Sequence, residues 1–283
     1  MKINQILDKI DEKQLFIPAF QREYVWRRGH AKNLIASLIR EYPTGTMLTW
    51  ETNTPPELKG DWEYSSHQGS VKIILDGQQR ITTLYMLIRG TLPPYYTESE
   101  IKYDPRGLYI HIETLELQYY KKTIMDNNPY WLNVTDIFQR KVRERNVIKE
   151  IKENGQELTN EQEDTISDNL QAVSNIPDLE FLEQTVPIRA TLKEAIDIFY
   201  IVNASGVNLT DAELALAQIS GYWPTAREEF KKKLEILKED GFVFKLDFII
   251  YCLLGILHNK GSEMTKLHDS SNEEELRTTW EKL

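Results

Sequence analysis

The fold of this chain is decided by a buried strand that runs directly into a helix, Ile73-Ile74-Leu75-Asp76-Gly77-Gln78-Gln79-Arg80. The apolar, β-branched run Val71 to Leu75 predicts a strand, and the residues after the Asp-Gly pair predict a helix over Gln78 to Arg89 that Gly90 ends. Glycine permits the tight turn between them, and the first N–H groups of a helix have no partner within it. With the helix dipole, this geometry predicts an anion site, where Arg80 can add a guanidinium and Asp76 a carboxylate.

The same stretch has a plainer interpretation. Many strand-to-helix turns look like this one, and Asp76 can simply cap the helix while Arg80 faces solvent. In the binding interpretation, Asp76 holds a metal ion through oxygen or fixes Arg80. In either case we expect Arg80, on the first turn, to face outward and to contribute little to packing.

Short strands and helices alternate around this stretch, and helices dominate later in the chain. We expect strands at Gln14 to Ile17 and Thr46 to Glu51, a helix over Arg28 to Glu41, and a hairpin formed by Gly107 to Glu113 and Leu115 to Tyr120. The pattern is that of an α+β fold. It predicts a core over residues 1–125 and a mainly helical region over 126–283, from which 185–190 return to the core sheet as a last strand near Val186 to Arg189.

Composition excludes several classes of protein. The chain has 283 residues, 41% of them hydrophobic, which is enough to bury a core. Its single cysteine, Cys252, excludes a disulfide framework, and five scattered histidines form no metal-ligand or H-N-H pattern. The most apolar stretch, Leu246 to Leu257, contains Asp247 and is too short to span a bilayer. We therefore expect a cytoplasmic protein with no membrane partner.

Charge is unevenly distributed along the chain. The net charge of −10 argues against a protein that wraps nucleic acid over its whole surface. Five basic residues oppose one acidic residue between Phe16 and Arg40, and six oppose two between Arg140 and Lys152. Such basic islands suit a confined anionic ligand, although solvated helix faces produce the same pattern.

Two further clusters carry polar and aromatic side chains in loops. Gln21, Arg22, Tyr24 and Trp26 precede the first predicted helix, where Arg22 can meet a phosphate and the rings can stack on a base or fill the core. The second cluster surrounds Asn203, between helices that begin at the capping boxes Thr191-x-x-Glu194 and Thr210-x-x-Glu213. It is also the pattern of an ordinary helical hairpin.

Taken in order, these clusters resemble a known family. Pro18-x-Phe20-Gln21-Arg22-x-Tyr24-x-Trp26, then Asp76-Gly77-Gln78-Gln79-Arg80-x-Thr82-Thr83-Leu84, then Phe199-x-x-x-Asn203-x-x-Gly206-x-x-Leu209 resemble the N-terminal domain of GmrSD-type modification-dependent restriction proteins. The resemblance covers most of the chain. It implies a ParB/sulfiredoxin-like α/β core followed by a helical region.

The resemblance also implies a function. Members of this family bind and hydrolyse nucleoside triphosphates in antiphage defence, and in longer members an H-N-H-type nuclease, C-terminal or separate, cuts modified DNA. Carried over to this chain, Asp76 and Arg80 are the catalytic candidates, and Asp76 is the candidate ligand of Mg²⁺. The nucleotide-binding candidates are Gln21, Arg22, Tyr24, Gly77, Gln78, Gln79, Arg80 and Asn203.

Three activities stay open on the residues. The domain can hydrolyse the nucleotide, since phosphoryl transfer to water needs mainly positioning and charge neutralisation. It can bind a nucleotide or a DNA phosphate without hydrolysis, as a sensor. As a third alternative, the ParB-like domain is itself a nuclease, but nothing after Asp211 supplies a His-Asn-His set.

Overall fold

The computed structural model describes residues 1–60, 62–155, 157–204, 210–220, 223, 225–258 and 273–283, and the chain folds into two compact units. The first unit comprises Met1–Leu15, Glu23–Met47 and Gly77–Gln184, and the second comprises Phe16–Arg22, Leu48–Asp76 and Thr185–Leu283. The predicted division at residue 125 falls inside the first unit. Helices and mixed sheets together confirm the α+β fold class, while the ParB-like core stays a prediction.

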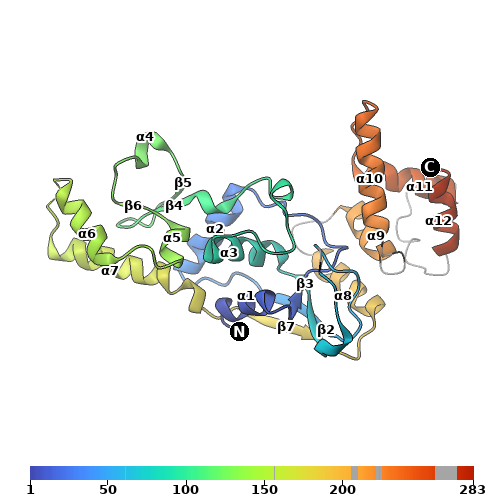
Figure 1. Ribbon diagram of the computed structural model, residues 1–283, viewed down its shortest axis with the longest axis horizontal. Helices are drawn as coiled ribbons and strands as arrows, with labels where there is room; N and C mark the ends of the chain where they lie inside the picture. Colours follow the sequence, from blue (N-terminus) through green and yellow to red (C-terminus); the bar gives the residue numbers. More distant parts are fainter. Residues whose placement is uncertain (61, 156, 205–209, 221–222, 224, 259–272) are drawn as a thin grey trace. The chain divides into compact units, whose positions relative to one another are not determined.

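The principal sheet has the strand order β1-β3-β2-β7. Its strands are β1 (Leu15–Phe16), β2 (Met47–Thr52), β3 (Val71–Asp76) and β7 (Glu183–Val186) (Figure 1). β2 and β3 are antiparallel, with Trp50 opposite Ile73, and the register shifts between Leu48 and Thr49. β7 ends where Pro187 follows, because proline has no N–H to give to a ladder. The observed strand is therefore earlier than the predicted Val186 to Arg189.

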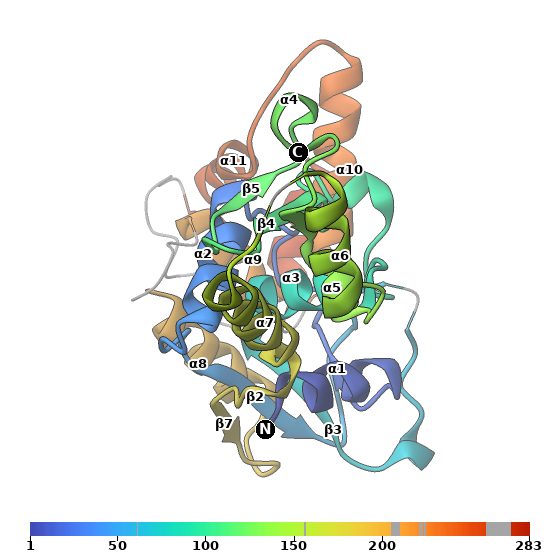
Figure 2. The ribbon, with the colours of Figure 1, turned by 90° about the vertical axis from the view of Figure 1, so that its left-hand side faces the viewer.

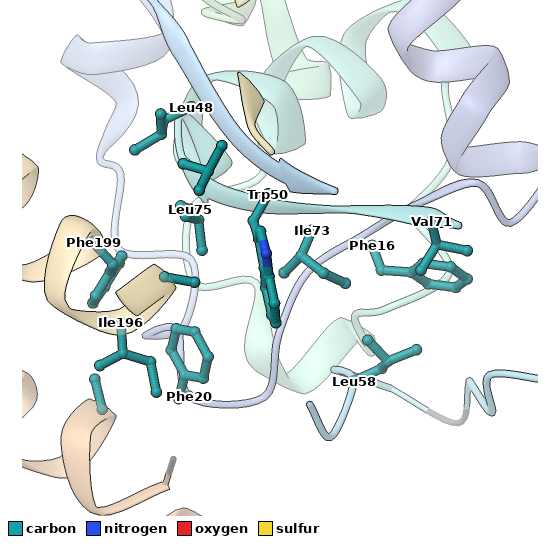
Figure 3. Packing of buried hydrophobic residues seen from close by; sticks show 13 residues of the cluster. Phe16, Phe20, Leu48, Trp50, Leu58, Val71, Ile73, Leu75, Ile196 and Phe199 are labelled. Atoms are coloured by element: carbon teal, nitrogen blue, oxygen red, sulfur yellow. The ribbon is translucent and has the colours of Figure 1, made fainter. Parts of the chain in front are cut away.

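A core cluster of the second unit lies against β2 and β3. Trp50, Ile73 and Leu75 pack with Ile196 and Phe199 of helix α8 (Leu192–Ala204) (Figure 3). β1 supplies Phe16, and loops supply Phe20 and Leu58, to the same cluster. Helix α8 begins with the predicted capping box, in which Thr191 N–H donates to Glu194 Oε2 at 2.7 Å and Glu194 N–H donates to Thr191 Oγ1 at 3.3 Å.

The first unit is built around helix α3 (Gln78–Arg89), which has the bounds that the sequence predicts. It contacts α1 (Ile3–Asp11), α2 (Arg28–Ile39) and α5 (Val134–Phe138), and it is buried on nearly every side. Gly90 ends α3 in the left-handed conformation, with φ of 71°. Because α3 is enclosed in this way, the residues at its first turn are held by the rest of the unit.

A second sheet of the first unit has the order β5-β4-β6, all antiparallel. Its strands are β4 (Leu108–His111), β5 (Leu117–Tyr119) and β6 (Trp131–Asn133), so the predicted hairpin is confirmed as β4 and β5. The other helices of this unit are α4 (Lys122–Met125), α6 (Glu144–Glu153) and α7 (Asn160–Ser174) (Figures 1 and 2). Short 3₁₀ helices occur at Ser66–Gln68, Glu98–Glu100, Pro105–Gly107 and Ile176–Asp178.

The remaining helices belong to the second unit. They are α9 (Asp211–Ser220), α10 (Ala226–Glu239), α11 (Leu246–His258) and α12 (Glu273–Glu281). Apolar side chains of these helices form a separate cluster, in which the rings of Phe230 and Trp280 stack with centroids 4.2 Å apart. Within the described ranges, no helix has the length and apolar character that crossing a membrane requires.

Candidate functional site

The turn between β3 and α3 has the geometry that its sequence predicts. Gly77 is the N-cap of α3, with φ of 99° and ψ of −1°, a conformation that strains any residue with a side chain. A Cβ atom on Gly77 would lie 3.4 Å from Arg80 Nη2 and 3.4 Å from Met47 Cγ. As N-cap, Gly77 offers no side-chain acceptor to the first N–H groups of α3. An anion can take that place, because a helix N-terminus favours negative charge.

Arg80 does not face outward as expected. Its guanidinium donates to the carbonyls of Thr44 and Thr46, the second at 2.8 Å from Nη2, and it lies 5.5 Å from the ring centroid of Phe181. Gly45, between the two threonines, has φ of 86°, and a Cβ there would overlap Arg80 Nη1. Arg80 is half-buried and holds the segment that leads into β2. The sequence feature that accompanies this contact is the run Thr44-Gly45-Thr46 before β2, which the sequence analysis did not single out.

Gln79 holds the loop before α2. Its Oε1 accepts from the N–H groups of Val25, at 2.9 Å, and Trp26, at 3.2 Å, and its Nε2 donates to the carbonyl of Glu23 at 3.0 Å. Only 9% of Gln79 is exposed. Both amide atoms are thus engaged by the backbone of the other predicted cluster, so the structure gives Gln79 a positioning role.

Tyr24 is the second anchor of this loop. Its hydroxyl lies 2.8 Å from Thr83 Oγ1, and Thr83 in turn donates to the carbonyl of Gln79. Burial raises the pKa of Tyr24 above its ordinary value, which already keeps the phenol neutral at physiological pH. Sequence reasoning did not single out Thr83 as a partner, although Thr83 lies one helical turn after Gln79. The ring of Trp26 stacks on His30, with centroids 5.5 Å apart.

Gln78 is also buried in the first unit, with 4% of the residue exposed. Its Nε2 donates to the hydroxyl of Tyr96 at 2.6 Å. Beside it, the hydroxyl of the fully buried Tyr95 lies 3.2 Å from Thr82 Oγ1. The side chain of Gln78 therefore points into a polar part of the core.

The second unit positions Gln21, Arg22 and Asp76. Gln21 is 3% exposed, and its Nε2 donates to the carbonyls of Ile74 and Leu75 at the end of β3. Arg22 and Asp76 are half-buried. The loop is therefore attached to β3 just before Asp76, which a sequence pattern does not reveal.

Two cations that sequence reasoning missed hold the same loop by its carbonyls. Lys59, 7% exposed, places its Nζ 3.3 Å from the carbonyl of Arg22 and 3.5 Å from that of Gln21. Arg227 of α10 donates to the carbonyl of Phe20 at 2.8 Å. These contacts fix the backbone of Phe20 to Arg22.

Asn203 lies in the last turn of α8, but its side chain is outside the described residues, as is the predicted Gly206 turn. In the part of the chain that the structure describes, no group of three histidine, cysteine, aspartate or glutamate side chains could hold a metal ion. Mg²⁺ is commonly held by one or two protein carboxylates together with phosphate oxygens. Asp76 can supply one such carboxylate.

Two comparisons place the chain among known proteins. Residues 3–220 match the family described as GmrSD restriction endonuclease, N-terminal domain. An uncharacterised protein of Methanocaldococcus jannaschii is 33% identical over 32% of this chain and 18% of its own length. The chain thus aligns with less than a fifth of that curated relative.

The family match begins with α1 and ends with the last residue of α9. It therefore includes the β3–α3 turn, the hydrogen bonds of Gln79 to the loop before α2, and those of Arg80 to Thr44 and Thr46. In the last two features, hydrogen bonds join residues that are far apart in the sequence. The chain belongs to the GmrSD restriction endonuclease family, with residues 3–220 as its N-terminal domain.

Proposed function

We propose that this restriction-system domain binds a nucleoside triphosphate with Mg²⁺ at the β3–α3 turn, hydrolyses it, and thereby regulates the cutting of modified DNA by an H-N-H-type nuclease domain. The observation that carries the proposal is the left-handed Gly77 turn, which opens α3 without a side-chain cap. The backbone N–H groups of such a turn suit a triphosphate. Family membership supports the link to restriction.

The chain's own residues have distinct roles in this proposal. The N–H groups at the start of α3 bind phosphate oxygens, and Arg22 stays a candidate for a charge-assisted contact to phosphate. Asp76 holds Mg²⁺, which would neutralise phosphate charge during transfer to water. Arg80 fixes the Thr44–Thr46 segment beside the turn and adds positive potential there. Gln21, Gln79 and Tyr24 act through the backbone that they hold.

A sensor that binds nucleotide without hydrolysis is the second candidate. The amide groups of Gln78 and Gln79 are engaged by protein partners, and the pKa of Tyr24 is raised by burial. None of these side chains is then suited to activate a water molecule. This observation favours binding without turnover.

One experiment separates the two candidates. The purified protein is titrated with each of the four nucleoside triphosphates in Mg²⁺, and phosphate release is then followed at saturation. Binding with steady release supports hydrolysis, binding without release supports the sensor, and no binding contradicts both. Asp76→Asn, which keeps the size of the side chain but removes its charge, should abolish the Mg²⁺ dependence of binding.

Arg80→Ala should weaken both nucleotide binding and the fold. Loss of the positive potential that Arg80 adds beside the turn predicts about a tenfold fall in affinity, and loss of the bonds to Thr44 and Thr46 predicts about 1–3 kcal/mol less stability. Affinity is measured by titration well below the unfolding temperature, and stability by thermal unfolding. Arg145→Ala, at an exposed position of α6, is the control and should change neither. Unchanged affinity with a lowered Tm would restrict Arg80 to a structural role.

The purified chain should not cleave DNA. Metal-assisted cleavage needs a water activator held beside the metal, and the described side chains contain no metal-binding group of three. Incubation with modified and unmodified plasmid in Mg²⁺ or Mn²⁺ should leave both intact. Metal-dependent cutting that Asp76→Ala abolishes would contradict this expectation and favour the nuclease alternative.

A further inference from the structure

We propose that two copies of this chain form a symmetric dimer through an exposed apolar face of the second unit. This α11 face is formed by the segment before α11 and by one side of the helix, and its residues are Phe242, Phe244, Phe248, Tyr251 and Gly255. The α11 face lies outside residues 3–220, which match the family, and it shares no residue with the β3–α3 turn. The inference therefore does not depend on the proposed nucleotide site.

Direct ring contacts and helical spacing place these residues on one face. Phe242 and Phe244 stack with centroids 5.9 Å apart, and Phe244 stacks on Phe248 with centroids 4.0 Å apart. Tyr251 and Gly255 follow Phe248 at three and seven residues, a spacing that keeps them on the same side of α11. The other side of α11 packs against α9 and α12 (Figure 1), and it carries the fully buried Ile249, Ile250, Leu253 and Leu254.

The exposed area of the α11 face is large enough for a weak, specific dimer. Its four aromatic residues are between 37% and 56% exposed. At about 200 Å² for each aromatic residue, they leave about 350 Å² uncovered. Two copies placed face to face would cover about 700 Å² of apolar surface, which corresponds to an interface of about 1,200 Å² because such interfaces are about 60% apolar. That total is at the lower end of specific interfaces.

Gly255 points to a second copy of the chain as the occupant. Glycine is less favourable than alanine inside a helix, yet a Cβ atom on Gly255 would meet no described atom within 4 Å. The described part of the chain therefore does not require a glycine there. Phe248 lies seven residues earlier, about 10.5 Å along the helix. In an antiparallel pair of α11 helices, Phe248 of each copy would fit over Gly255 of the other, the reciprocal contact that a two-fold axis demands.

The charge of this region favours an apolar partner. From 242 to 256 the only charged residues are Lys245 and Asp247, which have opposite signs. The region therefore has no net charge with which to attract an acidic or a basic partner. A second α11 face, equally apolar and complementary in shape, matches these properties.

The inference is tested by sedimentation velocity of the whole chain over about 1–100 µM. The wild type should change from monomer to dimer with a Kd in the micromolar range, as expected for an interface of this size. Gly255→Leu should weaken dimerisation about tenfold or more, because the new side chain fills the space that Phe248 of the second copy needs. Phe248→Ser should weaken it by a similar factor, because it removes the ring itself.

Two variants of the first unit are the matched controls. Gly29→Leu also introduces a side chain at a helical glycine whose Cβ would meet no described atom within 4 Å. Ile124→Ser changes an apolar residue of α4 that is as exposed as Phe248. Both controls should dimerise like the wild type. The Tm of Gly255→Leu should be no lower than that of the wild type, and if this variant does not fold, Phe248→Ser decides.

Three results would overturn the proposal. They are a wild type that stays monomeric over the whole range, a wild type that grows into open-ended assemblies, and a dimer that the two α11 variants retain unchanged. Phosphate release from nucleotide, measured on the same preparations, reports on the proposed function separately. Loss of dimerisation in the α11 variants, with both controls normal, supports the α11 face whether or not phosphate is released.

Discussion

Gln79→Leu should destabilise the first unit by about 2–4 kcal/mol, because it removes three hydrogen bonds and leaves backbone groups of Glu23, Val25 and Trp26 without their partner. Leucine has nearly the volume of glutamine, so the effect comes from the polar groups rather than from a cavity. The loop that carries Tyr24 should then loosen. Nucleotide affinity should fall with it if this loop supports the proposed site.

Hydrogen exchange gives a local measurement of this effect. The amides of Val25 and Trp26 should exchange much faster in Gln79→Leu, and thermal unfolding should shift to lower temperature. Gln171→Leu, at an exposed position of α7, is the matched control and should leave both unchanged. If Gln79→Leu kept normal exchange but lost nucleotide affinity, Gln79 would bind the ligand directly and would not act by positioning the loop.

Trp50→Ala should destabilise the second unit by about 3–5 kcal/mol, the usual cost of truncating a large buried aromatic side chain. Trp50 is 2% exposed and lies at the centre of the core cluster between β2, β3 and α8 (Figure 3). Its indole N–H donates to the carbonyl of Ala190 at 3.2 Å, so the substitution also leaves a carbonyl unpaired. We expect β3, and with it the support of Asp76, to be disturbed.

Thermal unfolding measures this destabilisation, which should lower the Tm by about 10 °C. Trp50→Phe keeps most of the apolar volume but not the indole N–H, so its effect should be clearly smaller. Tyr42→Ala serves as the exposed aromatic control. A shift for Trp50→Ala no larger than that of Trp50→Phe would contradict the importance of the packed indole.

Local signals predicted the centre of the fold accurately. The helix over Gln78 to Arg89 has the predicted bounds because Gly77 and Gly90 both adopt left-handed backbone, which glycine makes easy. Helix α1 was not predicted, although Ile3, Ile6, Leu7 and Ile10 follow helical spacing and are buried. The last strand was misplaced because its pairing beside β2 is a long-range event.

The sequence specifies the Gly77 turn and the α3 helix, since these depend on residues that are neighbours along the chain. It also specifies the family, whose motifs are read from the sequence without the fold. It also marked Gln21, Gln79 and Arg80 as important, but not what they do. Their roles follow from the tertiary structure alone. The partners of Gln79 lie 53 to 56 residues away in the sequence, and the carbonyls that Arg80 contacts lie 34 and 36 residues away. A buried amide or guanidinium must find hydrogen-bond partners wherever the folded backbone provides them. Sequence spacing over such distances does not specify which carbonyls and N–H groups those are.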